Sequence, residues 1–339
     1  MMYLENDKLV ISFPELHPSA GVKIDLQRTL RLPDDGEDHY LPPGLGRFPL
    51  RHVDDFDLGS QDAIKKRGGV IMPMFQADAL WLNFEPLTSD FEDEEYPVAI
   101  KIGTGKICAV SGDSWTDSLN QDPQDYIVVP EQPWLDGYNV SDGTVRQFVA
   151  APLGDGVTVE EQIGKTDDVG GIQIQVFPMK KSYFEEVYSQ RKQPELMMCM
   201  SLEMSDTCSS DDGFMGLSAG GKMRQEIYDD PYELSAWDQR TNDRCFITIA
   251  NANQWMSLTG EEPPLSPISA DEYTSSGLPW FSYFDADKKA IEGAKALGNL
   301  KSFQKSYAEK GKKSWANENI SKKKKLVEAR RREVSRGNW

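Results

Sequence analysis

The chain has 339 residues, of which 39% are hydrophobic and 27% charged, a composition typical of a folded globular protein rather than a disordered one. A chain of this length forms one large domain or about two ordinary ones. No run approaches the roughly 18 apolar residues that a transmembrane helix needs. Residues 1–13 lack the basic and apolar regions of a signal peptide. We therefore expect no membrane span.

Charge divides the chain into two unequal parts. The formal net charge is −18, but residues 301–339 hold 13 Lys/Arg against 4 Asp/Glu, so this tail carries +9 and residues 1–300 carry −27. A body this acidic repels nucleic acid and anionic membranes, whereas the tail attracts them or attracts the acidic body of a neighbouring copy. Nucleic acid is therefore a candidate partner for the tail only.

The elements predicted along the first two-thirds of the chain are mainly strands, because short apolar runs of alternating polarity lie between turn residues. The clearest is Gly171–Phe177, where branched apolar residues alternate with glutamines, as in a strand with one buried face. Recurring turn signals favour an antiparallel sandwich or barrel-like body over a βαβ fold. The expected strands span residues 8–13, 21–32, 68–75, 79–84, 97–103, 106–110, 126–129, 145–151, 157–163, 171–177, 222–228 and 244–250, and residues 33–43, 88–96 and 205–213 are expected loops.

Helices are expected to be few before residue 285. Lys181–Arg191 is compatible with one, and Ser269, three residues before Glu272, forms a capping box that predicts a helix start. After Asp285 the chain becomes rich in Ala and Lys, and its apolar residues at near-helical spacing predict a helix over 286–307.

Ser321–Val334 is also compatible with a helix, although it has too few apolar residues to be stable alone in water. The predicted fold class is mostly β (α+β), with a β-rich body over residues 1–284 and a helical basic C-terminal extension over 285–339. The body is one unit or two related β units with a boundary near residues 140–155, because Gly-Gly pairs precede apolar strands in both halves.

One segment matches a phosphate-binding pattern. Gly216–Lys222 satisfies G-x-x-x-x-G-K, but a phosphate loop also needs a buried strand before it, Ser or Thr after the lysine and a helix behind it. Met223 follows the lysine, the preceding residues are polar, and the following ones predict a strand. We therefore expect a Gly-rich turn that leads into a strand, and no nucleotide site.

Patterns for catalysis and metal binding are missing too. All three histidines lie in the first 52 residues, and no H-x-x-x-H or C-x-x-C spacing occurs. Acidic residues are too common for any pair to indicate glycoside hydrolysis. We expect no catalytic residue, metal ligand or cofactor, which favours a non-enzymatic protein without excluding an enzyme. The cysteines are too few for a disulfide framework and predict free thiols in the cytoplasm or another reducing intracellular compartment; they are Cys108, Cys199, Cys208 and Cys245.

Two features are candidate interaction sites. The tail carries two basic runs, typical of contact with an acidic surface, nucleic acid or lipid headgroups, although a solvated terminus is the simpler alternative. Two tryptophans follow prolines in loop-like contexts, where an indole can stack on a sugar or anchor a protein, although a buried indole at the end of a sandwich fits as well. The candidate residues are Lys322, Lys323, Lys324, Lys325, Arg330, Arg331, Arg332, Trp134 and Trp280.

The stretches that carry a resemblance are LPPGLGRFPL, MPMFQADALWLNF, QPWLDG, VRQFVAAPLG, FMGLSAGGKMRQEIYDDPY, RCFITIANANQW and GLPWF. Together they resemble a family of uncharacterised proteins from bacteria and fungi. The resemblance spans about Leu41 to Asp285 and leaves the basic tail out. It implies no activity, cofactor or site residue.

The leading hypothesis is a non-enzymatic structural or interaction protein that self-assembles when its basic tail contacts the acidic body of another copy. The expected partner is thus a protein, with a homo-oligomer as the first candidate. Two alternatives stay open: a carbohydrate-active or carbohydrate-binding protein that uses the loop tryptophans and carboxylates, and nucleic-acid binding through the tail.

Overall fold

The computed structural model describes residues 1–56, 62–88, 95–165, 170–188, 214–265, 267–283, 285–312 and 325–328. Its strands are β1 Met2–Glu5, β2 Lys8–Ser12, β3 Gly21–Thr29, β4 Asp38–His39, β5 Arg51–His52, β6 Val70–Pro73, β7 Ala79–Pro86, β8 Val98–Thr104, β9 Ile107–Cys108, β10 Ile127–Val129, β11 Trp134–Leu135, β12 Gly137–Ser141, β13 Thr144–Pro152, β14 Ile172–Pro178, β15 Phe214–Arg224, β16 Asp243–Ala250, β17 Pro279–Ser282 and β18 Lys325–Glu328. Its helices are α1 Asp62–Arg67, α2 Lys181–Tyr188, α3 Ala252–Thr259, α4 Ala270–Ser275, α5 Lys295–Gly298 and α6 Phe303–Glu309, with short helical turns η1 Val53–Asp55, η2 Glu160–Gly164 and η3 Leu234–Ala236.

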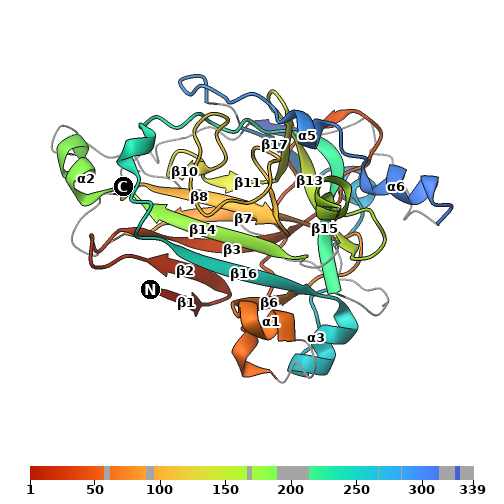
Figure 1. Cartoon of the computed structure of the whole chain (residues 1–339). Helices are drawn as coiled ribbons and strands as arrows, with labels where there is room; N and C mark the ends of the chain where they lie inside the picture. Colours follow the sequence, from red (N-terminus) through yellow and green to blue (C-terminus); the bar gives the residue numbers. More distant parts are fainter. Residues whose placement is uncertain are drawn as a thin grey trace, which may run out of the picture.

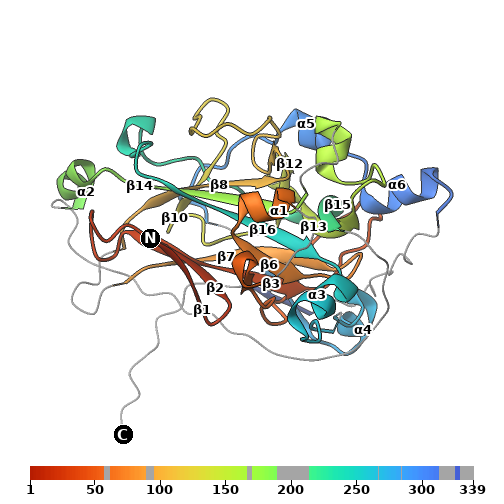
Figure 2. The same cartoon turned by 60° about the horizontal axis from the view of Figure 1, so that its bottom comes forward.

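One 16-stranded sheet dominates the described part of the chain, and its main path runs β1–β2–β3–β7–β13–β15–β16–β14–β8–β10. Most neighbours are antiparallel, and β4 and β6 pair in parallel with β15 and β16. Figure 2 separates a layer that contains β8, β14 and β16 from a layer that contains β3 and β7, and Figure 1 shows the helices at the margins. The predicted mostly β, sandwich-like fold is confirmed.

The main core is one continuous cluster of buried side chains drawn from both layers. Its members alternate along the strands, as Ile24 and Leu26 do in β3, because successive side chains of a strand point to opposite faces. The Tyr138 hydroxyl donates to Thr104 Oγ1 at 3.0 Å, which links β12 to β8 across the core.

Strands from the two halves of the sequence are interleaved in this sheet. β13 occupies most of the region around residues 140–155, and it pairs with β7 on one side and with β15 on the other. Because β13 hydrogen-bonds to strands from both halves, it joins them in one sheet.

β14 was expected to have one solvated face, and the structure corrects this. Gln173 and Gln175 on its outer face are both buried, because the loop around Trp115 lies over them. Gln173 donates to the carbonyl of Gly105 at 2.7 Å and Gln175 donates to Asn242 Oδ1 at 2.8 Å. These bonds give the buried Nε2 groups acceptors, while Gln175 Oε1 is buried without a hydrogen-bond partner among the described residues.

The Gly216–Lys222 segment lies wholly inside β15 rather than in a turn. Its glycines permit close packing. A Cβ on Gly220 would lie 2.5 Å from Val149 Cγ2, and one on Gly221 would lie 2.3 Å from the Pro33 carbonyl oxygen. The G-x-x-x-x-G-K match therefore reflects backbone approach between neighbouring segments rather than a phosphate loop.

The strand expected over residues 157–163 is wrong, since a π-helical turn covers Glu160–Gly164. Glu161 causes this turn. Its carboxylate accepts the backbone N–H groups of Gly154, Gly156, Val157 and Thr158 at 2.8–3.1 Å, as well as the Thr158 hydroxyl. Although burial opposes the effect, these donors lower the pKa of Glu161. Local capping thus outweighs the apolar alternation.

Two helices before residue 285 agree with their sequence signals, and two, α1 and α3, were not expected. Ser269 and Glu272 form the capping box at the start of α4. α2 occupies the first part of Lys181–Arg191. α3 was missed, although Asn251 and Gln254 form a second capping box in which both reciprocal hydrogen bonds are present.

Residues 285–312 pack on the body and do not form the single helix expected over 286–307. After a turn at residues 286–288, the backbone of Ile291 donates to Ile227 and that of Ala294 donates to Asn139, so the chain runs extended along the body until the short helix α5. Leu297 and Phe303 are 0% and 3% exposed, and α6 covers a second apolar cluster beside β13. Tertiary hydrogen bonds therefore replace helical ones here.

Within Ser321–Val334, which is compatible with a helix, the structure describes Lys325–Glu328, and these residues form strand β18 in parallel with β17. A helix with so few apolar residues gains little from forming alone. The edge of β17 supplies backbone partners instead. The rest of this segment lies outside the described residues.

Candidate functional site

The structure places the two candidate tryptophans differently. Trp280 in β17 is fully buried, with its ring edge-on to Tyr273 at 5.9 Å, so its indole presents no face to a partner. Trp134 in β11 is half-buried and meets Tyr283 edge-on at 4.9 Å. The two were expected in loops, and both lie in strands.

The basic tail is described in two pieces. Lys325 begins β18, while Lys322, Lys323, Lys324, Arg330, Arg331 and Arg332 lie outside the described residues. β18 pairs with β17 in a parallel register that places Lys325 beside Pro279 and Glu328 beside Ser282. The tail therefore contacts the body through backbone pairing as well as through charge.

The start of the tail is held by one carboxylate of the body. The Lys312 ammonium forms an ion pair with Asp155, the Lys310 ammonium donates to the Asp155 carbonyl, and the Tyr307 hydroxyl donates to Asp155 Oδ2 at 2.9 Å. Although partial burial opposes it, the Lys312 and Tyr307 hydrogen bonds lower the pKa of Asp155. Asp155 is thus a charged anchor for residues 307–312 at neutral pH.

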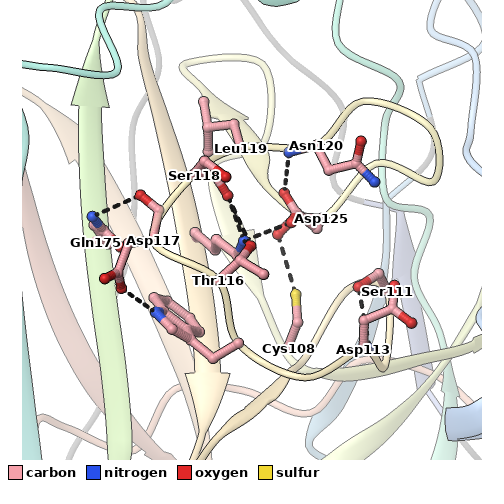
Figure 3. A network of polar contacts seen from close by, with 12 residues as sticks. Cys108, Ser111, Asp113, Thr116, Asp117, Ser118, Leu119, Asn120, Asp125 and Gln175 are labelled. Carbon is pink, nitrogen blue, oxygen red and sulfur yellow. Dashed lines mark hydrogen bonds and ion pairs between the residues drawn. The ribbon is translucent and has the colours of Figure 1, made fainter.

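A buried ion pair lies under the loop that covers β8 and β14 (Figure 3). Lys101 is 1% exposed, and its ammonium donates to Asp125 Oδ2 at 2.6 Å, to Thr116 Oγ1 at 2.8 Å and to the Ser118 carbonyl at 2.7 Å. Asp125 also accepts the backbone N–H of Asn120 at 2.9 Å. All three ammonium protons are used.

This saturation gives the Lys101 network a structural role. Burial raises the pKa of Asp125, while Lys101 and the Asn120 N–H oppose that rise. The Lys101 ammonium donates to three acceptors of its own chain, so it has no donor left for a substrate. The Trp115 ring, 5.3 Å from the ammonium, lies over Gly103, where a Cβ would come within 2.7 Å of the indole. The network fastens the loop to the sheet.

A second buried cluster joins the loop before β10 to residues 230–237. Asp230 Oδ2 accepts the Tyr126 hydroxyl at 2.5 Å and the Trp237 indole N–H at 2.8 Å, and Asp230 Oδ1 accepts the backbone N–H of Tyr232 at 2.8 Å. Burial raises the pKa values of Asp230 and Tyr126. The donors surround one carboxylate and leave no general base directed at solvent.

A third carboxylate, Asp136, is buried beside Trp134. Asp136 is 3% exposed, and its Oδ2 accepts the Trp134 indole N–H at 2.7 Å. Burial raises the pKa of Asp136 to about 7, which the Trp134 hydrogen bond only partly opposes. Asp136 therefore titrates near neutrality.

One open groove of about 730 Å³ runs between Lys180 and residues 234–240. Trp237 lies along it, and Asp238 is its one carboxylate. Neither Trp134 nor Trp280 lines this groove, and the Lys180 ammonium already donates to the Ser235 carbonyl at 2.7 Å. It therefore lacks the paired carboxylates and exposed indole that the carbohydrate hypothesis requires.

Other chemistry is sparse in the part of the chain that the structure describes. No group of three or more His, Cys, Asp or Glu side chains converges there as metal ligands do. Cys108 and Cys245 are free and buried, and burial raises the pKa of both thiols. Cys199 and Cys208 lie outside the described residues. No helix in the described ranges is long and apolar enough to cross a membrane.

No family model matches the chain, and neither a curated protein nor a solved structure matches it. The resemblance over residues 41–285 stays a prediction. The function has to be inferred from the residues of the chain itself.

The sequence interpretation missed the buried ionisable residues. Lys101 lies within the apolar run PVAIKIG, and this position indicates a buried ion pair because a charge inside a buried strand needs a partner. Trp134 and Asp136 are two residues apart and share one face of an extended segment, which was a usable signal for their contact. No local pattern in the sequence indicated that Asp125 and Thr116 are the partners of Lys101.

Proposed function

We propose that this chain is a non-enzymatic interaction protein that self-assembles when its basic tail docks on the acidic body of a neighbouring copy. The observation that carries the proposal is the contact of Lys310 and Lys312 with Asp155, because it gives a concrete example of tail lysines held by the body. One exposed ion pair contributes only about 0–1 kcal/mol. Residues 313–339 contain a further 9 of the 13 tail cations, and their combined attraction is what would join two copies.

The buried polar groups support a role without catalysis. Lys101, Asp125 and Asp230 are each surrounded by donors or acceptors from their own chain. Groups used in this way hold loops in place. The buried free thiols fit a reducing intracellular compartment, which we propose as the location.

The test compares the full chain with a version that ends at Lys312, which keeps the Lys310 and Lys312 contacts with Asp155 and lacks residues 313–339. Light scattering would measure mass over a concentration series at low and at high salt. We expect the full chain to exceed the mass of one copy at low salt and to return to it at high salt, where the Debye length falls to about 3 Å at 1 M. The shortened chain should stay a monomer.

A matched pair of charge variants sharpens this test. Changing Lys322–Lys325 to glutamine removes four tail charges and should weaken association. Changing four exposed body lysines to glutamine, Lys66, Lys106, Lys181 and Lys295, makes the body more acidic and should preserve or strengthen association. A full chain that stays monomeric at every concentration and salt rejects self-assembly. Tail-dependent DNA binding by such a monomer would instead favour the nucleic-acid alternative.

A further inference from the structure

Strand β17 has one edge that is bridged to Leu41 and a second edge that faces β18. Phe281 exchanges both backbone hydrogen bonds with Leu41, donating to its carbonyl at 3.0 Å and accepting its N–H at 2.9 Å. Backbone groups of successive strand residues point to opposite edges. Trp280 and Ser282 therefore direct their N–H and C=O groups toward the second edge, where β18 lies.

This second edge is preformed by the packing of β17 on α4. The buried Trp280 donates its indole N–H to Thr274 Oγ1 at 3.1 Å, and the Tyr273 hydroxyl donates to the Pro279 carbonyl at 2.8 Å. Both bonds tie β17 to the helix that precedes it. A strand edge held in this way loses little conformational freedom when it accepts a partner.

We propose that the second edge of β17 is a strand-docking site, and that its partner is residues 325–328 of a second copy, paired in the register of the resident β18. This inference rests on the proposed self-assembly and specifies its contact. Replacing one copy's strand by the identical strand of another preserves the pairs Trp280–Leu326 and Phe281–Val327, as in domain swapping.

The length and charge of the tail allow this exchange. Lys325 follows Lys312 by 13 residues, which span up to about 45 Å when extended. The run Lys322–Lys325 directly precedes or begins the docked strand, so attraction to a body of −27 favours its approach. The resident strand competes at an effective concentration of the order of millimolar. Binding of a strand from another molecule is therefore easiest to measure when the resident strand is absent.

The experiment uses a fluorescent peptide of residues 319–334 and the body that ends at Lys312. Fluorescence anisotropy should detect saturable binding to this body, and binding at least about tenfold weaker to the full chain, whose edge is occupied. Val327→Pro in the peptide removes a backbone donor and should weaken binding at least about tenfold, whereas Val327→Ile should retain it. A peptide of scrambled order and equal charge separates strand pairing from charge.

Variants of the body test the other side of the contact. Ser282→Pro removes the backbone donor of Ser282 at the docking edge, and Ser282→Thr is its matched control, with circular dichroism to check that both fold. Docking at this edge is ruled out if the native, Val327→Pro and scrambled peptides bind the shortened body equally. It is also ruled out if the Ser282→Pro body binds the native peptide as well as the Ser282→Thr body does. If full chains associate and Val327→Pro full chains associate equally, self-assembly stands and strand exchange fails. If the shortened body binds the peptide in this sequence-dependent way but full chains never associate, the docking edge stands and self-assembly fails.

Discussion

The buried carboxyl of Asp136 makes stability depend on pH near neutrality, and Asp136→Asn should remove that dependence. Asp136 is 3% exposed and accepts one side-chain donor, the Trp134 indole N–H at 2.7 Å. Asparagine has nearly the same volume, and its amide oxygen can accept the same N–H. It cannot ionise, so the variant isolates the effect of charge.

The size of this change in stability follows from the difference in the proton affinity of Asp136 between the folded and the unfolded chain. Burial raises the pKa of Asp136 from 3.8 to about 7 in the folded chain. Between these two pH values the folded chain retains a proton that the unfolded chain has lost, so stability falls as the pH rises through this window. At about 1.4 kcal/mol per tenfold change in proton affinity, the total is about 4 kcal/mol. Above the folded pKa this contribution is constant.

Urea unfolding followed by tryptophan fluorescence, from about pH 4 to about pH 8, measures the effect. Relative to the native chain, Asp136→Asn should gain about 4 kcal/mol across this range, with most of the gain reached by pH 7. Asp113→Asn changes an exposed carboxyl and should track the native chain throughout. If native and Asp136→Asn proteins show parallel pH profiles, Asp136 is not the titrating group and the reasoning from its burial is refuted.

Two further predictions concern the other charged contacts. Lys101→Met leaves the buried Asp125 without its ammonium partner and should lower the free energy of unfolding in urea by about 3–5 kcal/mol. The control Lys106→Met changes an exposed lysine of the same hairpin and should lower it little. Equal losses of stability in the two variants would contradict the role assigned to the ion pair. Asp155→Asn removes the ion pair to Lys312 and should speed amide hydrogen exchange in residues 303–312 at neutral pH, whereas Glu309→Gln, on the exposed pair with Lys301, should not. Because the pKa of Asp155 is lowered in the fold, its contribution is complete above pH 4 and is lost as the pH falls through the folded pKa, so the native chain should approach the variant in acid.

Local patterns determined the strands and some helix starts. The alternation in residues 172–176 produced β14, and Ser269 with Glu272 produced the start of α4, because side-chain periodicity and capping bonds act between near neighbours. The mostly β fold and the division into an acidic body and a basic tail follow from the sequence alone. These properties depend on composition and on residues a few positions apart.

The tertiary structure alone decided where those elements pack and which polar groups are buried. The segment 289–294 is extended because its backbone bonds to Ile227 and Asn139, which no local signal encodes. Trp280 is buried because it packs into the main core cluster, and Lys325 lies in a strand because β17, from an earlier part of the chain, supplies its backbone partners. Long-range packing outweighs local propensity at these positions, since a buried backbone group must find a partner wherever the fold supplies one.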